Sequence, residues 1–424
     1  MDLRAIAQGA KAASKKLALA SNDVKNNTLH LLADQLWSNR AQILAENSLD
    51  VQDAEQAGLT QAMIDRLLLN EKRLEGICAD LRSVACLPDP VGEKFDEIVL
   101  ANGLRVHKQR VPLGVLAVVY ESRPNVTIDV AGLALKSGNS VILRGGSETL
   151  RSNRTLVKVV RETLLQNSLP VDCVQFIDSP DRSLVLELMR LYEYIDMLIP
   201  RGGAGLHRFC RENSLVPVIT GGIGICHLFV DGSANLDKAL EVVRNAKIQR
   251  PTVCNALDTV LVHRSAAGIF LPALVEKLAK DGVTFRVDRE AENLLVGAEL
   301  SLPARSSIQP AGPGDFDTEW LSLVLGIKVV GGLDEAVEHI EQHSTGHSDG
   351  ILTGSQENAQ HFISLVDSAV VYVNASTRFT DGAQMGLGAE IAISTQKLHA
   401  RGPMALRELT TYKWVACGDY QVRI

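Results

Sequence analysis

The sequence has no excess of basic residues and no long apolar run. Its 43 lysines and arginines are outnumbered by 50 aspartates and glutamates, and the net charge of -7 argues against nucleic acid as the main partner. No apolar stretch approaches the length of a membrane span, so no membrane partner is expected. Charged residues interrupt the N-terminal alanines and leucines, which argues against a signal peptide.

Paired cysteine motifs are also missing. The seven cysteines are scattered, odd in number and without a CxxC pair, which is typical of a reducing compartment and not of a disulfide framework. We therefore expect a cytoplasmic protein. With 424 residues, of which 46% are apolar, the chain is long enough to bury a large core and to form two or three domains.

From Leu113 onward, short apolar runs alternate with helix-length segments, after a first stretch up to about Leu87 with helical spacing. Near-continuous apolar runs separated by helices indicate parallel sheets covered on both faces, so the chain is predicted to be an α/β protein. The expected strands are 115–120, 140–143, 174–177, 195–199, 216–219, 227–230, 257–263, 326–330 and 370–374.

Residues 95–112 have a different residue pattern, in which two β-prone arms flank Asn102 and Gly103. This dipeptide is the strongest short hairpin signal, since both central positions of such a turn need positive φ. The arms carry many charges and few core residues. We therefore expect a hairpin that projects from the body and pairs with another subunit.

Two of the expected strands are followed, within two residues, by an arginine and then by glycines. The segments are Arg144-Gly145-Gly146-Ser147 and Arg201-Gly202-Gly203. Glycines let the backbone approach a ligand closely, and the helix that follows offers unpaired N–H groups to an anion. Neither segment is a full GxGxxG fingerprint or a Walker loop. Together they favour a phosphate-bearing ligand over two ordinary strand-to-helix turns.

Cys254 occupies the loop KIQRPTVCNA at 247–256, between a helix-like stretch and a strand-like one. A thiolate on such a loop attacks carbonyl carbon well, and a cation such as Lys247 or Arg250 would activate it. The alternative is a small buried hydrophobe, which the loop alone favours. A long polar tract at 374–403 is the other candidate functional segment, suited to an anionic substrate.

Three histidines recur every four residues, at His339, His343 and His347. This spacing can present metal ligands on one face of a helix. However, Ser344, Thr345 and Gly346 are expected to end the helix, and no accompanying carboxylate or thiolate ligands are evident. We interpret the histidines as a solvated face and expect no metal.

Five long blocks together resemble the γ-glutamyl phosphate reductase family of the aldehyde dehydrogenase superfamily, in the family's order and over essentially the whole chain. The blocks are VPLGVLAVVYESRPNVTIDVAGLALKSGNSVILRGG, DMLIPRGGAGLHRFCRENSLVPVITGGIGICH, NAKIQRPTVCNA, VYVNASTRFTDGAQMGLGAE and STQKLHARGPM.

The resemblance implies an aldehyde dehydrogenase-like fold, with two parallel-sheet α/β domains and a protruding β-hairpin oligomerisation flap. The cofactor-binding domain is expected to comprise 1–94 and 113–225, with 385–405 returning towards it. The catalytic domain is expected at 226–384, and the flap at 95–112 and 406–424.

The resemblance also implies a reaction, the NADPH-dependent reduction of γ-glutamyl phosphate to glutamate 5-semialdehyde and phosphate. This is the second step of proline biosynthesis. Cys254 matches the nucleophile, and Asn125 takes the place of the asparagine that holds the oxyanion. Arg144, with Gly145 and Gly146, corresponds to the strand end at the adenosine ribose, and Glu319 to the glutamate at the nicotinamide ribose.

One departure from the superfamily concerns the acyl acceptor. Hydrolytic aldehyde dehydrogenases carry a glutamate at the head of an ELGG motif, as a base for water attack on the thioester. This sequence has ITGG, with Ile219 at that position. The missing carboxylate favours phosphate over water as the acyl acceptor.

The substrate's charges require basic or hydroxyl contacts, and several residues are candidates. They are Arg123, Arg250, Arg378 and Lys397, with Ser376 and Thr377 as hydroxyl donors. The preference for NADPH over NADH depends on whether Arg144 or Arg151 reaches the 2′-phosphate. A homodimer or tetramer and association with glutamate kinase stay open. The alternatives are a hydrolytic aldehyde dehydrogenase acting on a small semialdehyde and a non-catalytic scaffold.

Overall fold

The computed structural model describes residues 1–221 and 223–423, so Gly222 of the ITGG segment lies outside the described residues. The chain divides into two compact units. The first unit comprises Met1–Thr220, Gly386–Ile393 and the segment from Pro403 onward. The second unit comprises Gly221–Met385 and Ser394–Gly402.

Capping side chains mark the starts of four of the five helices that open the first unit, α3 being the exception. Ser21 accepts a hydrogen bond from the N–H of Val24, and Asn70 accepts one from the N–H of Arg73. The expected helical stretch is therefore confirmed. Its helices are α1 (Leu3–Leu17), α2 (Asn22–Ser38), α3 (Arg40–Gln56), α4 (Gln61–Leu67) and α5 (Glu71–Cys86).

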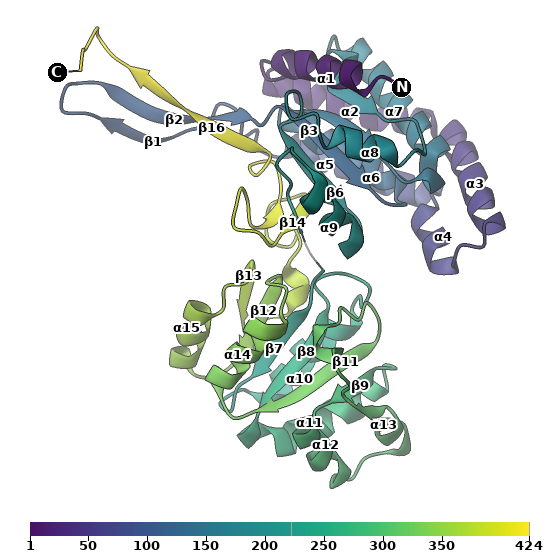
Figure 1. Cartoon of the computed structure of the whole chain (residues 1–424), viewed down its shortest axis with the longest axis vertical. Helices are drawn as coiled ribbons and strands as arrows, with labels where there is room; N and C mark the ends of the chain where they lie inside the picture. The colour runs from purple at the N-terminus through teal and green to yellow at the C-terminus, as the bar shows by residue number, and fades with distance from the viewer. Residues whose placement is uncertain (222, 424) are drawn as a thin grey trace. The chain divides into compact units, whose positions relative to one another are not determined.

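A parallel sheet lies in the first unit, and its order is β5-β4-β3-β6. Its strands β3 and β6 lie side by side among the helices of this unit (Figure 1). All six residues of β3 are buried, as expected of a strand covered on both faces. The strands are β3 (Val115–Tyr120), β4 (Ser140–Arg144), β5 (Val174–Phe176) and β6 (Met197–Arg201). The helices are α6 (Pro124–Lys136), α7 (Leu150–Gln166), α8 (Ser183–Leu188) and α9 (Ala204–Asn213), with short 3-10 turns η1 (Ser147–Thr149) and η2 (Val171–Cys173).

Two strand predictions in this unit need correction. The expected strand 216–219 is not a strand, because Val218 makes only an isolated bridge to Leu198. The Pro217 carbonyl accepts the N–H of Leu198 at 2.8 Å, but proline has no N–H to donate in return. The pairing is therefore not extended into a ladder. The expected strand 195–199 begins two residues later, at Met197.

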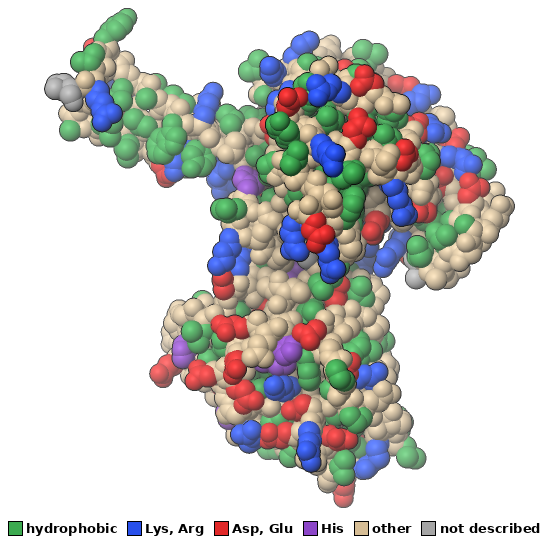
Figure 2. All heavy atoms as spheres, viewed as in Figure 1, with side chains coloured by type: hydrophobic (Ala, Val, Ile, Leu, Met, Phe, Trp, Pro, Cys, Tyr) green, Lys and Arg blue, Asp and Glu red, His purple; other side chains and the backbone are tan. Residues whose placement is uncertain are grey.

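A three-stranded antiparallel sheet forms the flap, which we define as β1 (Lys94–Val99), β2 (Arg105–Pro112) and β16 (Thr410–Cys417). The hairpin forms, but its turn is longer than expected. Leu100 N–H donates to the Leu104 carbonyl at 2.9 Å, and only Gly103 of the two turn residues has positive φ. Hydrophobic side chains are visible over the flap in Figure 2. Its pairing with another subunit stays a prediction.

The second unit contains a seven-stranded parallel sheet in the order β10-β9-β11-β8-β7-β12-β13. Its strands are β7 (Cys226–Val230), β8 (Leu257–His263), β9 (Thr284–Val287), β10 (Ile308–Pro310), β11 (Val324–Val330), β12 (Ser348–Leu352) and β13 (Val370–Val373). Alternate residues enter different cores, since Leu228 and Val230 belong to one and Phe229 to the other. Both faces are therefore covered, as the apolar runs predict.

Helices cover the two faces of this sheet. They are α10 (Leu236–Ile248), α11 (Arg264–Ala279), α12 (Arg289–Val296), α13 (Leu302–Ser306), α14 (Leu333–His343) and α15 (Gln356–Leu365). The polar tract 374–403 stays largely irregular, as expected. The remaining elements are η3 (Asp315–Asp317), η4 (Thr377–Phe379), β14 (Ala392–Ser394) and β15 (Gly402–Met404). In the described part of the chain, no helix combines the length and apolarity that a membrane crossing requires.

Candidate active site

Cys254 lies on the loop between α10 and β8, where its side chain is half-buried. The start of β7 and the residues just before it contact the backbone of this loop. The thiol of Cys226 donates to the Cys254 carbonyl at 3.3 Å, and a Cβ at Gly224 would come within 1.6 Å of the same oxygen. Only glycine at residue 224 permits this close backbone approach.

Glu319 lies on the other side of Gly224. Its Oε1 accepts the N–H of Gly224 at 2.9 Å, and burial raises the pKa of this carboxyl above its ordinary value. One backbone segment thus links the carboxylate to the loop of Cys254. The structure therefore brings together two residues that are 65 positions apart in the sequence.

The start of the polar tract is bonded directly to the residue after the thiol. Thr377 Oγ1 donates to the Asn255 carbonyl at 2.7 Å, and Asn255 Nδ2 donates to the Thr380 carbonyl at 2.8 Å. Ser376 accepts the N–H of Arg378 at 3.3 Å. Ser376 and Thr377 are buried, so η4 is a fixed part of this loop cluster.

Arg378 carries the charge of this cluster. Its Nε donates to Gln249 at 2.8 Å. Burial and the positive charge of Arg250 lower the pKa of Arg378, whereas the nearby thiol of Cys254 raises it. Cys254, Arg250 and Arg378 are therefore near neighbours in the second unit, and an anion here would meet two guanidinium groups.

Two other cations of the second unit are engaged elsewhere. Lys397 is mostly exposed and pairs with Asp367 at 2.5 Å, and with Arg401 it lowers the pKa of that carboxyl to about 2. Lys247 is fully buried, donates to the Leu257 carbonyl at 2.8 Å and faces Asp258 at 3.7 Å. Arg250 and Arg378, and not Lys247, are thus the cations beside the thiol.

The buried pair of Lys247 and Asp258 supports the strand that follows the loop. Burial lowers the pKa of Lys247 and raises that of Asp258, while the opposite charge of each partner acts against these shifts. Asp258 also accepts the N–H groups of Trp320 at 3.1 Å and Cys226 at 3.4 Å. This carboxylate therefore ties together three segments around the thiol loop.

In the first unit, Asn125 occupies the first turn of α6. Its Nδ2 donates to Asp129 Oδ2 at 2.9 Å, one helical turn further on. Arg123 immediately precedes the helix and is exposed. The SRPN segment thus places an amide and a guanidinium at one helix start, and Pro124 sets the entry into that helix.

The end of β4 is closely packed. A Cβ at Gly145 would lie 2.3 Å from Asn153 Nδ2, and one at Gly146 would lie 2.4 Å from Glu148 Oε2. Ser147 is exposed, and its hydroxyl donates to Glu148 at 3.2 Å. Gly145 is therefore closely packed against buried side chains, whereas the atom nearest to Gly146 is the end of a flexible glutamate.

Arg144 lies at this strand end, where its guanidinium bonds to backbone. Nη1 donates to the Gly145 carbonyl at 2.8 Å and Nη2 to the Pro180 carbonyl at 3.2 Å. The buried Nε has no hydrogen-bond acceptor in the described part of the chain. Burial and the charge of Arg182, an exposed residue just beyond Pro180, lower the pKa of Arg144.

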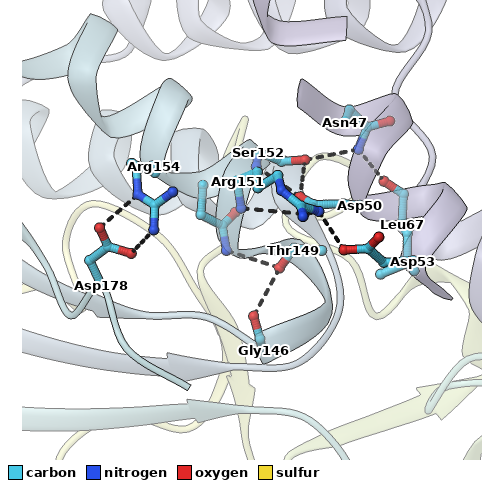
Figure 3. Close-up of polar contacts among 11 residues, drawn as sticks. Asn47, Asp50, Asp53, Leu67, Gly146, Thr149, Arg151, Ser152, Arg154 and Asp178 are labelled. Atoms are coloured by element: carbon cyan, nitrogen blue, oxygen red, sulfur yellow. Dashed lines mark hydrogen bonds and ion pairs between the residues drawn. The ribbon is translucent and has the colours of Figure 1, made fainter. Parts of the chain in front are cut away.

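The start of α7 is already capped by a carboxylate from α3 (Figure 3). Asp50 accepts the N–H of Ser152 at 2.8 Å and that of Arg151 at 3.3 Å. The side chain of Arg151 pairs with Asp53 at 2.5 Å. The free helix N-terminus expected after the RGGS segment is therefore occupied, because a distant acidic residue satisfies its N–H groups.

The second glycine turn has a similar cap. The N–H of Gly203 donates to Glu121 Oε2 at 3.2 Å, and a Cβ at Gly202 would lie 2.5 Å from Glu121 Cδ. The N–H of Glu121 donates to the Arg201 carbonyl at 3.0 Å. The sequence analysis did not predict this role of Glu121, although the residue directly precedes the SRPN segment and could have been considered for that reason.

The interpretation of the three histidines as a solvated face is wrong. His339 and His347 are buried, with 3% and 1% of their surfaces exposed. His339 lies on the inner face of α14, between Ala336 and Ile340, and burial lowers its pKa to about 2. The helix does end at His343, as expected. Among the described residues, no cluster of three histidine, cysteine or carboxylate side chains is arranged to hold a metal.

Comparisons with known proteins extend this description. Residues 1–309 match the model of the aldehyde dehydrogenase family. The γ-glutamyl phosphate reductase of Shewanella piezotolerans is 56% identical over 421 residues, which cover 99% of this chain and 98% of that protein.

Solved structures show the same relationship. The crystal structure of γ-glutamyl phosphate reductase from Thermotoga maritima has a TM-score of 0.96 and 48% identity, with full coverage of both chains. An engineered glycolyl-CoA reductase with bound NADP⁺ has a TM-score of 0.66 and 17% identity over 97% of this chain and 95% of that one. These likenesses confirm the predicted aldehyde dehydrogenase-like α/β fold.

Proposed function

The chain belongs to the aldehyde dehydrogenase family and, within it, to the γ-glutamyl phosphate reductases, and from this membership we propose that it reduces γ-glutamyl phosphate to glutamate 5-semialdehyde. Phosphate is the second product, and the reaction is the second step of proline biosynthesis. The observation that carries the proposal is the full-length match, at 56% identity, to a protein of that name. The geometry around Cys254 is consistent with it.

Cys254 is the proposed nucleophile. Its thiolate attacks the acyl carbon, phosphate leaves, and a γ-glutamyl thioester remains on the sulfur. The amide of Asn125 and the backbone N–H of Cys254 stabilise the oxyanion, a contribution of about 3 kcal/mol per donor. A bound nicotinamide cofactor supplies the hydride that reduces this thioester. The resulting thiohemiacetal on Cys254 collapses to the semialdehyde and restores the thiolate.

Arg250 and Arg378 are the proposed contacts for the anionic groups of the substrate. Both lie beside the thiol, and Arg378 is fixed by its bond to Gln249 at 2.8 Å. Ser376 Oγ accepts the N–H of Arg378, and Thr377 Oγ1 donates to the Asn255 carbonyl, so both residues fix this segment, and the Ser376 O–H stays a proposed donor to the substrate. Arg123 and Lys397 stay candidate contacts for the substrate. Lys397 already pairs with Asp367.

The proposed cofactor is NADPH. The orphaned Nε of Arg144, buried at the end of β4, fits a ligand with oxygen acceptors, such as the adenosine ribose. Gly145, Gly146 and Ser147 belong to the same strand end, and Arg201, Gly202 and Gly203 to the end of β6. Glu319, which holds Gly224 beside the thiol loop, is the proposed contact of the nicotinamide ribose.

Preference for NADPH requires a cation for the 2′-phosphate, and Arg182 is the better candidate. Arg144 donates to two carbonyls and Arg151 pairs with Asp53. Arg182 is exposed on the loop after β5, the strand beside β4, and none of the described residues forms an ion pair with it. In such sheets the ribose lies at the strand ends, so this loop is well placed.

The competing function is a hydrolytic aldehyde dehydrogenase, and the residue at position 219 argues against it. Ile219 is buried and apolar, so it offers no base to activate water. A reductase that exchanges its thioester with phosphate needs no such base.

NADP-linked oxidation of glutamate 5-semialdehyde, followed by cofactor absorbance with and without inorganic phosphate, tests the proposal. We expect strict dependence on phosphate, loss of turnover in Cys254→Ala and unchanged turnover in Cys86→Ser, an exposed cysteine of the first unit. Steady turnover without phosphate would mean that water resolves the thioester, and the hydrolytic function would replace the reductase.

The flap is the proposed interface of a homodimer or tetramer. Tyr412 and Trp414 are 46% and 59% exposed on β16, an edge strand of this sheet. Light scattering of Trp414→Lys is expected to show a smaller oligomer. An association with glutamate kinase and a cytoplasmic location are further parts of the proposal.

A further inference from the structure

A hydrogen bond joins Asn125, the proposed oxyanion contact, to the carboxyl of Asp129. The two residues lie four positions apart in α6, so their side chains share one face of the helix. Asn125 Nδ2 donates to Asp129 Oδ2 at 2.9 Å, and no other hydrogen bond of the Asn125 side chain exists within 1–221 and 223–423.

An ionised carboxylate imposes a direction on this bond. A carboxylate only accepts hydrogen bonds, whereas the amide of Asn125 has two N–H donors and one oxygen acceptor. The amide must therefore turn its nitrogen towards Asp129, because the flipped orientation would place two oxygens against each other. One N–H is used in this bond, and the second stays available to a ligand.

The surroundings of Asp129 make its charge sensitive to pH. The residue keeps some exposed surface, but burial of the carboxyl is the largest cause that raises its pKa, to about 6. The bond from Asn125 on α6 lowers the pKa, Asp80 on α5 raises it, and Arg201 at the end of β6 lowers it. Among the residues that the structure describes, Asp80 and Arg201 are the charged groups that act on this carboxyl.

We propose that Asp129 is a positioning residue, whose ionised carboxylate holds the Asn125 amide in the orientation that presents an N–H to the substrate oxyanion. This inference rests on the proposed function, because it gives Asn125 the oxyanion role. Protonated Asp129 carries an O–H donor that can pair with the amide oxygen instead, so the orientation of the amide is no longer enforced.

The test compares turnover numbers of wild type and Asp129→Asn from pH 5 to pH 8. The variant keeps the shape of the side chain but loses its charge and its direction of bonding. We expect kcat of wild type divided by kcat of Asp129→Asn to be near one at pH 5 and to rise to roughly five by pH 8. This factor corresponds to the difference in strength between a charged and a neutral hydrogen bond. Using the ratio removes any pH dependence that both proteins share.

Two further variants separate positioning from a structural role. Asn125→Ala should lower kcat by roughly a hundredfold, and in that background Asp129→Asn should have no further effect. Asp80→Asn removes the exposed charge beside Asp129, and should move the inflection of the kcat ratio to lower pH while leaving its plateau unchanged.

A kcat ratio that is constant across this pH range would overturn the proposal, as would an equal effect of Asp129→Asn in both backgrounds. These results would leave the reductase itself intact. Failure of the proposed function would appear differently, as wild-type turnover that does not depend on phosphate.

Discussion

Gly224 lies directly against the carbonyl of Cys254, so closely that a Cβ at residue 224 would come 1.6 Å from the carbonyl oxygen. Residue 224 does not have positive φ, and the need for glycine is therefore one of space. Glu319 Oε1 accepts the N–H of the same glycine at 2.9 Å. The position of the thiol loop thus depends on a residue 30 positions earlier in the chain.

Gly224→Ala is expected to displace this loop and to lower kcat by roughly a hundredfold, since misplacement of a nucleophile by about 1 Å has an effect of that size. Gly76→Ala is the matched control, because a Cβ there has no neighbour within 4 Å on α5. The control should keep full activity and gain up to about 1 kcal/mol of stability. A Gly224→Ala protein with wild-type kinetics would contradict the tight packing.

Arg378→Ala should raise the KM for the acyl phosphate by roughly tenfold or more, because a charge-assisted hydrogen bond contributes about 1.5–3 kcal/mol. Steady-state kinetics measures the effect. Arg289→Ala, an exposed arginine at the start of α12 in the same unit, should have none. Unchanged KM and kcat in Arg378→Ala would show that this arginine does not contact the substrate.

Arg182→Gln should weaken NADPH binding by roughly tenfold and leave NADH binding as it is, because only NADPH carries the 2′-phosphate. Titration calorimetry with each cofactor measures the two affinities. Arg190→Gln removes another exposed arginine of the first unit and serves as the control. An equal loss for both cofactors would assign Arg182 a general role and not one in specificity.

His339→Phe should make the protein less sensitive to acid. Burial lowers the pKa of His339 to about 2, below the 6.5 of an exposed histidine. As pH falls below 6.5, the unfolded state gains a proton that the folded state does not take up, so stability is lost. At pH 5 this loss is about 2 kcal/mol from His339 alone.

Urea unfolding at pH 7 and pH 5 checks this expectation. The decrease in unfolding free energy between the two pH values should be smaller in His339→Phe than in wild type by that amount. His30→Gln replaces an exposed histidine of α2 and should keep the wild-type decrease. The same decrease in His339→Phe would mean that His339 becomes protonated in the folded protein.

Local patterns in the sequence were sufficient for much of the fold. Apolar runs such as 115–120 and 257–263 identify strands because burial on both faces leaves no room for polar positions. Short strands with polar or glycine residues, such as β12 with Asp349 and Gly350, were not predicted, because tertiary neighbours and not propensity make them strands. The loop position of Cys254 followed from the elements on either side.

By itself the sequence determined the fold class, the family and the thiol loop, because alternation, composition and long ordered motif blocks are properties of the chain read in order. Only the tertiary structure decided which charged side chains are already bonded within the chain. Asp50 caps α7 from a hundred residues away, Glu121 accepts the N–H of Gly203, and Asp258 pairs with the buried Lys247. Such pairings depend on which side chains folding brings within bonding distance, and no local pattern records that distance.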